Sequence, residues 1–253
     1  MQITFLGTGT STGVPEVGCR CEVCRSEDRK DKRLRCSSLI VTDGGLRLLV
    51  DCSPDFREQC LRYAIDRVDA VVVTHEHYDH VGGIDDLRPF CRDGSLPLYA
   101  EEYVCDRLKE RLPYCFGPNR YPGVPDITLH PLSLEPFHIG EERIVPIRLL
   151  HGRLPIFGYR IGRMAYLTDL SVLPEEEYGK LEGVEVLVIA ALRRQAHVAH
   201  QSLDAALQKI RRIAPSRGSY LIHFSHALGR HEEVSAELPP NVFLSYDGLH
   251  LEF

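Results

Sequence analysis

A run of β-branched residues, Val71-Val72-Val73-Thr74, leads directly into His75-Glu76-His77-Tyr78-Asp79-His80. This feature constrains the fold most, because a buried strand must end where three imidazoles and a carboxylate begin. Imidazole and carboxylate groups are common ligands of zinc and similar divalent ions. Successive side chains diverge, so the four cannot all bind one ion, but they can serve two neighbouring ions, with the first two histidines on one side and the aspartate and third histidine on the other. The alternative, a surface loop with chance histidines, is disfavoured because such clusters usually mark functional sites.

Short apolar runs bounded by turn residues recur along the chain and are typical of strands. We expect strands at Met1–Leu6, Ser38–Val41, Leu46–Val50, Ala70–Val73, Ile144–Leu149, Ile156–Ile161, Met164–Leu167, Val184–Ala190, Tyr220–Phe224 and Val242–Tyr246. Helices are expected at Asp55–Ala64, Glu101–Leu112 and Ser202–Ile213. Three of the strands fall in the first fifty residues, so the chain opens with adjacent strands. The pattern predicts an α/β fold of two mixed sheets flanked by helices, in one domain over residues 1–253.

The length of 253 residues and the hydrophobic content of 43% suffice for one large core. A formal net charge of −6 argues against a protein that coats nucleic acid, which needs a basic face. No stretch reaches the roughly 20 apolar residues that a membrane span requires. The first residues, Met1–Gly7, lack the charged region and the long apolar region of a signal peptide. We therefore expect a cytoplasmic protein without a membrane partner.

Three of the nine cysteines are clustered as Cys19-Arg20-Cys21-Glu22-Val23-Cys24. The C-x-C-x-x-C spacing curls a loop around one ion and is typical of a structural zinc site. A fourth ligand is missing nearby, and we expect His226 to complete a closed Cys₃His site that contributes folding energy. A redox dithiol and three free buried thiols are the alternatives. The other six cysteines are scattered and suit small buried side chains.

The H-x-H-x-D-H spelling of residues 75–80 resembles the signature of the metallo-β-lactamase superfamily. The resemblance implies an αββα sandwich with metals at the sheet edges. It also requires a later histidine, a bridging aspartate and a final histidine, each just past a strand, and matching residues follow three later apolar runs. The resemblance therefore implies two ligand groups and one bridge: His75, His77 and His151 for the first metal, Asp79, His80 and His223 for the second, and Asp169 between them.

Four motifs together narrow the resemblance to the PhnP-like phosphodiesterases, and they span the whole chain. They are the stretch Gly7–Pro15, the C-x-C-x-x-C loop, the H-x-H-x-D-H motif and the late H-x-x-H pair of His223 and His226. This resemblance implies hydrolysis of a small phosphodiester substrate, such as phosphoribosyl 1,2-cyclic phosphate. It also implies two divalent ions in the active site, zinc or manganese, beside one structural zinc, and a homodimer.

Asp79 and His200 are the residues that we expect to take part directly in catalysis. The PhnP-like family places a histidine before its late helix and near the phosphate, and His200 fits that position better than His197. Its expected role is either general acid to the leaving oxygen or a contact to the phosphate. Arg193 and Arg194 either add charge for a second phosphate or form solvated surface, and the surface interpretation is favoured.

Two other features have both a functional and a structural interpretation. Asp51 follows the apolar run Leu48–Val50 and either orients a ligand histidine or begins a turn. The glycines and small hydroxyls of Gly7–Gly13 either present backbone N–H groups to an anion or form a tight turn, and no P-loop lysine follows them. The sequence leaves both choices open.

Other functions are compatible with the same ligands. A lactonase or thioesterase of this superfamily is the first alternative. A ribonuclease Z would need a basic or glycine-rich arm to grip tRNA, and no such insertion is visible, so tRNA is not an expected partner. A pyrroloquinoline quinone biosynthesis B-like protein shares the cysteine loop without hydrolysis, but the complete ligand set argues against it. Segment 113–146, dense in proline and glycine, is expected to be irregular with one or two short strands, in a substrate mouth or a subunit contact.

Overall fold

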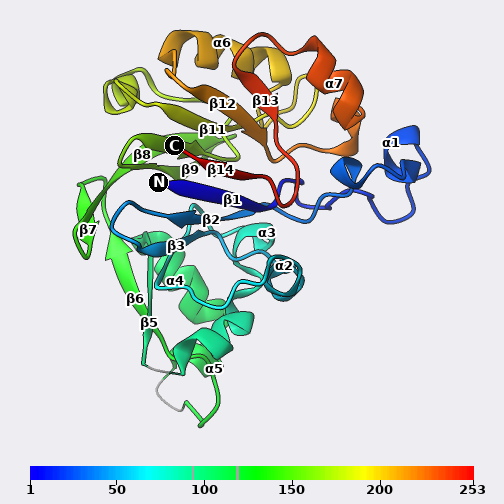
Figure 1. Cartoon of the computed structure of the whole chain (residues 1–253). Helices are drawn as coiled ribbons and strands as arrows, with labels where there is room; N and C mark the ends of the chain where they lie inside the picture. Colours follow the sequence, from blue (N-terminus) through cyan, green and yellow to red (C-terminus); the bar gives the residue numbers. More distant parts are fainter. Residues whose placement is uncertain (93, 118–119) are drawn as a thin grey trace.

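The computed structural model describes residues 1–92, 94–117 and 120–253. Within these residues the strands form two seven-stranded sheets, packed face to face with helices on both outer faces (Figure 1). The strand order is β14-β1-β2-β3-β4-β5-β6 in the first sheet and β13-β12-β11-β10-β9-β8-β7 in the second. The predicted fold class of two mixed sheets flanked by helices is confirmed.

The elements follow one another in a strand-rich order. The strands are β1 Gln2–Gly7, β2 Ser37–Val41, β3 Arg47–Val50, β4 Ala70–Val72, β5 Leu96–Glu101, β6 Ile127–Leu132, β7 Phe137–Ile139, β8 Glu142–His151, β9 Leu154–Ile161, β10 Met164–Leu167, β11 Val186–Ala190, β12 Gly218–Ile222, β13 Val242–Leu244 and β14 His250–Glu252. The α-helices are α1 Glu22–Arg25, α2 Phe56–Tyr63, α3 Tyr78–Val81, α4 Glu102–Arg111, α5 Pro113–Phe116, α6 Leu203–Ile213 and α7 His231–Glu237. The 3₁₀ helices are η1 Arg29–Asp31, η2 Ile84–Cys91, η3 Glu175–Leu181 and η4 His226–Leu228.

Each sheet is parallel in one half and antiparallel in the other. In the first sheet, β3 to β6 run parallel, whereas β14, β1, β2 and β3 pair antiparallel. In the second sheet, β10 to β13 run parallel, whereas β7 to β10 pair antiparallel. The carboxyl ends of β3 and β4 therefore share one sheet edge, and those of β8, β10 and β12 share an edge of the other sheet.

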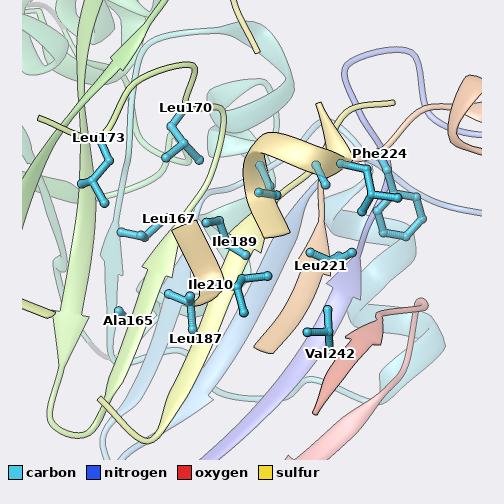
Figure 2. Close-up of a cluster of buried hydrophobic side chains, with 14 of the residues drawn as sticks. Ala165, Leu167, Leu170, Leu173, Leu187, Ile189, Ile210, Leu221, Phe224 and Val242 are labelled. Atoms are coloured by element: carbon cyan, nitrogen blue, oxygen red, sulfur yellow. The ribbon is translucent and has the colours of Figure 1, made fainter. Parts of the chain in front are cut away.

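Successive side chains of a strand point to opposite faces of its sheet. The apolar side chains therefore fall into three buried layers, one between the two sheets and one on the outer face of each sheet. On β4, Val72 packs between the sheets, while Val71 packs with α2 and α4 on the outer face of the first sheet. On β11, Val188 packs between the sheets and Leu187 packs under α6. Figure 2 shows this last cluster, in which Ile210 of α6 lies over the second sheet.

Helix α6 forms as predicted. The hydroxyl of Ser202 accepts a hydrogen bond from the backbone N–H of Ala205 at 3.3 Å and so caps the helix. Leu203, Ala206 and Ile210 are buried on one face. The three-to-four-residue spacing of these apolar side chains therefore places α6 against the second sheet, beside the strands that lead to the site.

The structure is more regular than the sequence predicts between β4 and β8. Strand β5 is absent from the predicted strands. It contains Pro97, which lacks a backbone donor, and β4 pairs with β5 only from Leu98 onward. In segment 113–146, expected to be irregular with one or two short strands, β6 and β7 agree with the expected strands, and α5 and the start of β8 add further order. Pro131 is tolerated there because β6 is an edge strand. Pro118, which belongs to that predicted segment, lies outside the described residues.

The two ends of the chain lie side by side (Figure 1). Strand β14 pairs antiparallel with β1, and the amino group of Met1 donates to the backbone carbonyl of Phe253 at 2.9 Å. In the part of the chain that the structure describes, no helix is both long enough and apolar enough to cross a bilayer.

Candidate metal centre

The seven predicted ligands meet where the strand ends of the two sheets converge. Their donor atoms form two adjacent groups, each with all its atoms within 4.8 Å of one another: His75, His77 and His151 in one, and Asp79, His80, Asp169 and His223 in the other. All but one of these side chains are buried, His77 being half-buried. Residues far apart in the sequence are thus brought together in the predicted grouping.

The four donors of the second group form a small cage. Nε2 of His80 lies 3.2 Å from Oδ2 of Asp79 and 3.3 Å from Oδ1 of Asp169. Nε2 of His223 lies 3.3 Å from Oδ2 of Asp79 and 3.1 Å from Oδ1 of Asp169. Tetrahedral ligands about 2.0–2.1 Å from zinc stand about 3.3 Å from one another. Since Nε2 of His80 is also buried without a hydrogen-bond partner among the described residues, this donor set fits a divalent ion.

The first group is joined to the second through Asp169. Nε2 of His75 lies 3.0 Å from Nδ1 of His77 and 3.8 Å from Oδ2 of Asp169. Asp169 therefore turns one oxygen toward each group, which is the arrangement of a bridging carboxylate.

Outer hydrogen bonds orient three of the ligand imidazoles. Nδ1 of His80 donates to Oδ2 of Asp51 at 2.6 Å, and Nδ1 of His75 lies 3.1 Å from the hydroxyl of Thr74, which itself donates to Asp51. Nδ1 of His151 donates to the backbone carbonyl of Ala199 at 2.7 Å. A proton held on Nδ1 leaves the lone pair of Nε2 for an ion. The functional interpretation of Asp51 is thus the one that the contacts support.

Three residues of the site have left-handed backbone conformations. Asp51, Asp169 and His223 have φ values of 59°, 54° and 55° and follow β3, β10 and β12 at the sheet edges. Such a conformation costs a residue with a Cβ about 1–3 kcal/mol, and it concentrates at functional sites. The sharp turns that it creates direct Asp169 and His223 of the second sheet toward His80 and Asp79, and direct Asp51 toward Thr74 and His80 of its own sheet.

Burial and neighbouring charges set the protonation of the cluster. Burial and the nearby His80 lower the pKa of His75 well below its ordinary value. Burial also lowers the pKa of His80, but the carboxylates of Asp169 and Asp79 outweigh it and raise that pKa. Burial raises the pKa of Asp169, but His223 and His80 outweigh it and hold the pKa well below the usual range. The carboxylate is therefore ionised, as metal ligation requires.

His200 lies at the rim of the first group. Its ring is 4.4 Å from the ring of His151 and stacks on His223 at 5.2 Å, and its Nδ1 is 3.9 Å from Oδ2 of Asp169. Burial lowers the pKa of His200 to about 3. His197 is exposed and accepts a hydrogen bond from the N–H of Ala199. His200 is thus the histidine of this pair that reaches the cluster.

The two arginines before this loop do not form a joint site. Arg193 donates to the carbonyl of Ala196 within its own loop. Arg194 pairs with Glu237 and donates to the carbonyl of Leu228. The surface interpretation that the sequence favours is supported for Arg194.

The stretch Gly7–Gly13 makes close backbone contacts. The N–H groups of Gly9, Thr10 and Gly13 donate to the carbonyls of Leu34, Phe224 and Thr10, respectively. A Cβ at Gly7 would lie 2.1 Å from the carbonyl oxygen of Arg35. Because these donors are engaged, the structural interpretation of the glycines is supported over anion binding.

The cysteine loop closes on His226. The donor atoms of Cys19, Cys21, Cys24 and His226 lie within 4.8 Å of one another. Nδ1 of His226 is 3.2 Å from Sγ of Cys21, while its Nε2 is 3.1 Å from a carboxylate oxygen of Glu16. Burial raises the pKa of Cys21, but hydrogen bonds from Cys24 and His226 outweigh it and lower the pKa to about 6. Four converging soft donors fit a closed zinc site better than a dithiol.

A comparison with protein families gives a match to the β-lactamase superfamily domain over residues 46–224. That range contains all seven ligands of the two groups and most of both sheets. The chain belongs to the β-lactamase superfamily. Its two seven-stranded sheets flanked by helices are the metallo-β-lactamase fold, as the H-x-H-x-D-H motif predicts.

Individual members of the superfamily resemble the chain over most of its length. A crystal structure of a diphosphatase from the PhnP family is 39% identical, with a TM-score of 0.92, and the match covers 100% of this chain and 96% of that one. An octanoyltransferase of Porphyromonas gingivalis is 50% identical over 98% of this chain and 51% of its own length. A ribonuclease Z of Crocosphaera subtropica is 30% identical over 72% of this chain and 57% of its own length. The chain thus spans little more than half the length of these two curated relatives.

Three groups that contact the predicted ligand residues were not predicted from the sequence. Thr74 follows a strand and precedes the first ligand, a position that could have indicated its bond to Asp51. Glu16 lies next to the cysteine loop, where an acidic partner of a ligand histidine is a reasonable search. The carbonyl of Ala199 leaves no trace in the sequence, because any residue supplies it.

Proposed function

We propose that this chain is a dinuclear metal-dependent hydrolase of a small phosphodiester, with phosphoribosyl 1,2-cyclic phosphate as an example of the substrate class. The observation that carries the proposal is the likeness over the whole chain, at 39% identity, to a diphosphatase of the PhnP family. The convergence of the two donor groups beside His200 supports it.

The two donor groups are the proposed ligands of two divalent ions, zinc or manganese, and the cysteine loop with His226 is the proposed site of a structural zinc. Two ions in the active site, when bound, would activate water and neutralise charge on the phosphoryl oxygens. Asp169, with an oxygen toward each group, holds the two ligand sets at a constant separation.

Asp79 and His200 are the proposed catalytic residues. The side chain of Asp79 is 8% exposed, against 2% for Asp169, so it is the more accessible carboxylate and is placed to accept a hydrogen bond from the attacking water. His200 lies on the rim beside His151 and His223 and can donate to a phosphoryl oxygen or to the leaving oxygen.

An acyl substrate is the second candidate. It is favoured by the 50% identity to the octanoyltransferase of Porphyromonas gingivalis. About half of that relative lies outside the match, so its name can describe the unmatched half. A lactone or thioester hydrolase would use the same ligands, and the proposed activity therefore has to be separated from it by substrate.

RNA and a non-hydrolytic role are less well supported. The ribonuclease Z relative is matched over only 57% of its length, and a net charge of −6 opposes binding of a polyanion. A role like that of the pyrroloquinoline quinone biosynthesis B proteins would leave the complete ligand set without a reaction to catalyse.

A substrate panel tests the proposal. Metal-free protein is reconstituted separately with zinc and with manganese and assayed on bis-p-nitrophenyl phosphate, a lactone and an octanoyl thioester. We expect metal-dependent turnover of the phosphodiester that His77→Ala abolishes and that His250→Ala, an exposed histidine bonded to Thr4, leaves intact. Clear cleavage of the lactone or thioester without phosphodiester turnover would replace this proposal by the acyl alternative.

A further inference from the structure

Glu76 stands between two ligand histidines but is bound to helix α4. Among the described residues it belongs to neither donor group. The hydroxyl of Tyr103 donates to its Oε1 at 2.9 Å, and Nη2 of Arg111 donates to its Oε2 at 2.7 Å. Nη1 of Arg111 also donates to the backbone carbonyl of Glu76. The side chain of Glu76 is only 14% exposed. Helix α4 therefore contacts both its carboxylate and its backbone carbonyl.

Helix α4 is a firm support for these contacts. Val104, Cys105 and Leu108 are buried in the outer layer of the first sheet. On its other side, the guanidinium of Arg107 lies 5.0 Å over the ring of Tyr103. Residues held by packed secondary structure fix a neighbouring loop more precisely than residues on another loop.

Asp51 holds the start of the loop that carries His75 and His77, because the N–H and the hydroxyl of Thr74 donate to it. Beyond Thr74 the loop has few backbone hydrogen bonds among the described residues. The N–H of Val73 donates to the carbonyl of Tyr99, and the carbonyl of Thr74 accepts from the N–H of Phe157; the next backbone bond in the described residues is donated by His80 to the carbonyl of His77. Between these backbone bonds the chain turns so that Nε2 of His75 lies 3.0 Å from Nδ1 of His77. The contacts of Glu76 with α4 fix this segment of the loop.

The same segment also reaches the strand of the third ligand. Glu101, which precedes α4, forms an ion pair with Arg148 of β8 at 2.6 Å. Arg148 is three residues before His151 on the same strand. All three ligands of the first group are thus connected to the β5–α4 segment, whereas His80 of the second group is held by Asp51.

We propose that Glu76, with Tyr103 and Arg111, is a positioning residue that sets the geometry of the first metal site, whereas Asp51 contacts His80 of the second site directly and reaches His75 of the first only through Thr74. This inference rests on the proposed dinuclear function. The inference makes a different prediction for each site. Removing the contacts of Glu76 should weaken binding of the ion in the first site and leave binding of the ion in the second site unchanged. A residue that served only overall stability would affect both alike.

Titration of manganese into metal-free protein, followed by electron paramagnetic resonance, tests the proposal. Manganese avoids the thiolate-rich cysteine site, so the signal reports the active-site pair. Glu76→Gln keeps the shape but presents an amide to the donors of Arg111. We expect it to weaken one of two binding steps about tenfold or more and to diminish the spin-coupled signal of the pair. Arg111→Lys, which keeps the charge but not the two-point contact, should give a smaller loss, and Tyr103→Phe is the milder variant if E76Q fails to fold.

Glu102→Gln is the matched control, since Glu102 is an exposed residue of the same helix and should bind as the wild type does. Two unchanged binding steps in folded E76Q, or equal weakening of both, would overturn the inference. Wild-type protein that binds fewer than two manganese ions would contradict the proposed dinuclear function instead, so the two failures are distinguishable.

Discussion

The buried carboxylate of Asp51 accepts three hydrogen bonds at once. The N–H and the hydroxyl of Thr74 donate at 2.8 and 2.9 Å, and Nδ1 of His80 donates at 2.6 Å. One side chain thereby joins the end of β4 to a proposed ligand and selects the tautomer that leaves Nε2 of His80 free. The left-handed backbone of Asp51 directs the carboxylate to this position.

Replacing Asp51 by asparagine should weaken metal binding. The amide group would place an N–H against one of the three donors, and His80 would lose its anionic partner. We expect Asp51→Asn to lower metal affinity about 10–100-fold, measured by competition with a chelator. Asp66→Asn, whose carboxylate is 82% exposed and paired with Arg47, is the control. Wild-type affinity in Asp51→Asn would show that the contact is incidental.

His200 is expected to matter for turnover more than for metal binding. Its donor atom converges with those of His151 and Asp169, but His75, His77 and His151 also form a group of three donors without it. We expect His200→Ala to lower kcat on a phosphodiester by about 10²-fold or more at unchanged metal content. His197→Ala, an exposed neighbour, should have little effect. Loss of an ion from His200→Ala would make His200 a ligand.

At the scale of elements, the cysteine loop is tied to the end of β12. Gly9 bridges to Phe224, and His226 follows three residues after His223. Among the described residues, a small apolar cluster of Val14, Val23 and Cys24 packs this loop from within, with Cys19 and Cys21 against it. A zinc ion held there would supply the missing stability.

Cys24→Ser should therefore release zinc and destabilise the protein. We expect a loss of about 2 kcal/mol or more, which corresponds to a fall in Tm of about 4 °C or more for a chain of this size. Zinc content and thermal unfolding measure the two effects. Cys91→Ser, at a cysteine outside the loop, should keep the zinc content and the Tm of the wild type. A Cys24→Ser protein with full zinc content and unchanged Tm would contradict the proposed structural zinc site.

Elements with one clear periodicity could be predicted from the sequence, and those held by distant partners could not. Helix α6 and strand β4 carry their own patterns of apolar residues. Strand β5 was not predicted. It contains Pro97, which is unfavourable in strands, and it pairs with β4 from Leu98 onward and with β6 from Leu96 onward. The convergence of the seven proposed ligands could be predicted because each follows an apolar run. The contacts of Glu76 could not, since Tyr103 and Arg111 are 27 and 35 residues away and no local pattern joins them.

At the scale of the whole molecule, the metal centre depends on the packing of the two sheets. His75, His77, Asp79 and His80 follow a strand of the first sheet, whereas His151, Asp169 and His223 belong to the second. The layer between the sheets buries aromatic side chains from both, such as Phe5 and Tyr166. We therefore propose that residues 1–253 form one folding unit; the homodimer stays a prediction.

Metal binding should stabilise this unit as a whole. A ligand present at 100 times its Kd raises the free energy of unfolding by about 2.7 kcal/mol. We expect manganese at that concentration to raise the Tm in a single calorimetric transition, and removal of the metal to reverse the shift. His77→Ala should show a smaller shift. Two separate transitions, with only one responding to metal, would contradict a site shared between the sheets.

The most direct test of the central claim is the rate of bis-p-nitrophenyl phosphate hydrolysis as manganese is added stepwise to metal-free protein. The proposed dinuclear site predicts no turnover without metal, a rise that levels off at two bound ions, and no rise in His77→Ala. Hydrolysis by the metal-free protein, or the absence of phosphodiester turnover when both ions are bound, would contradict the claim.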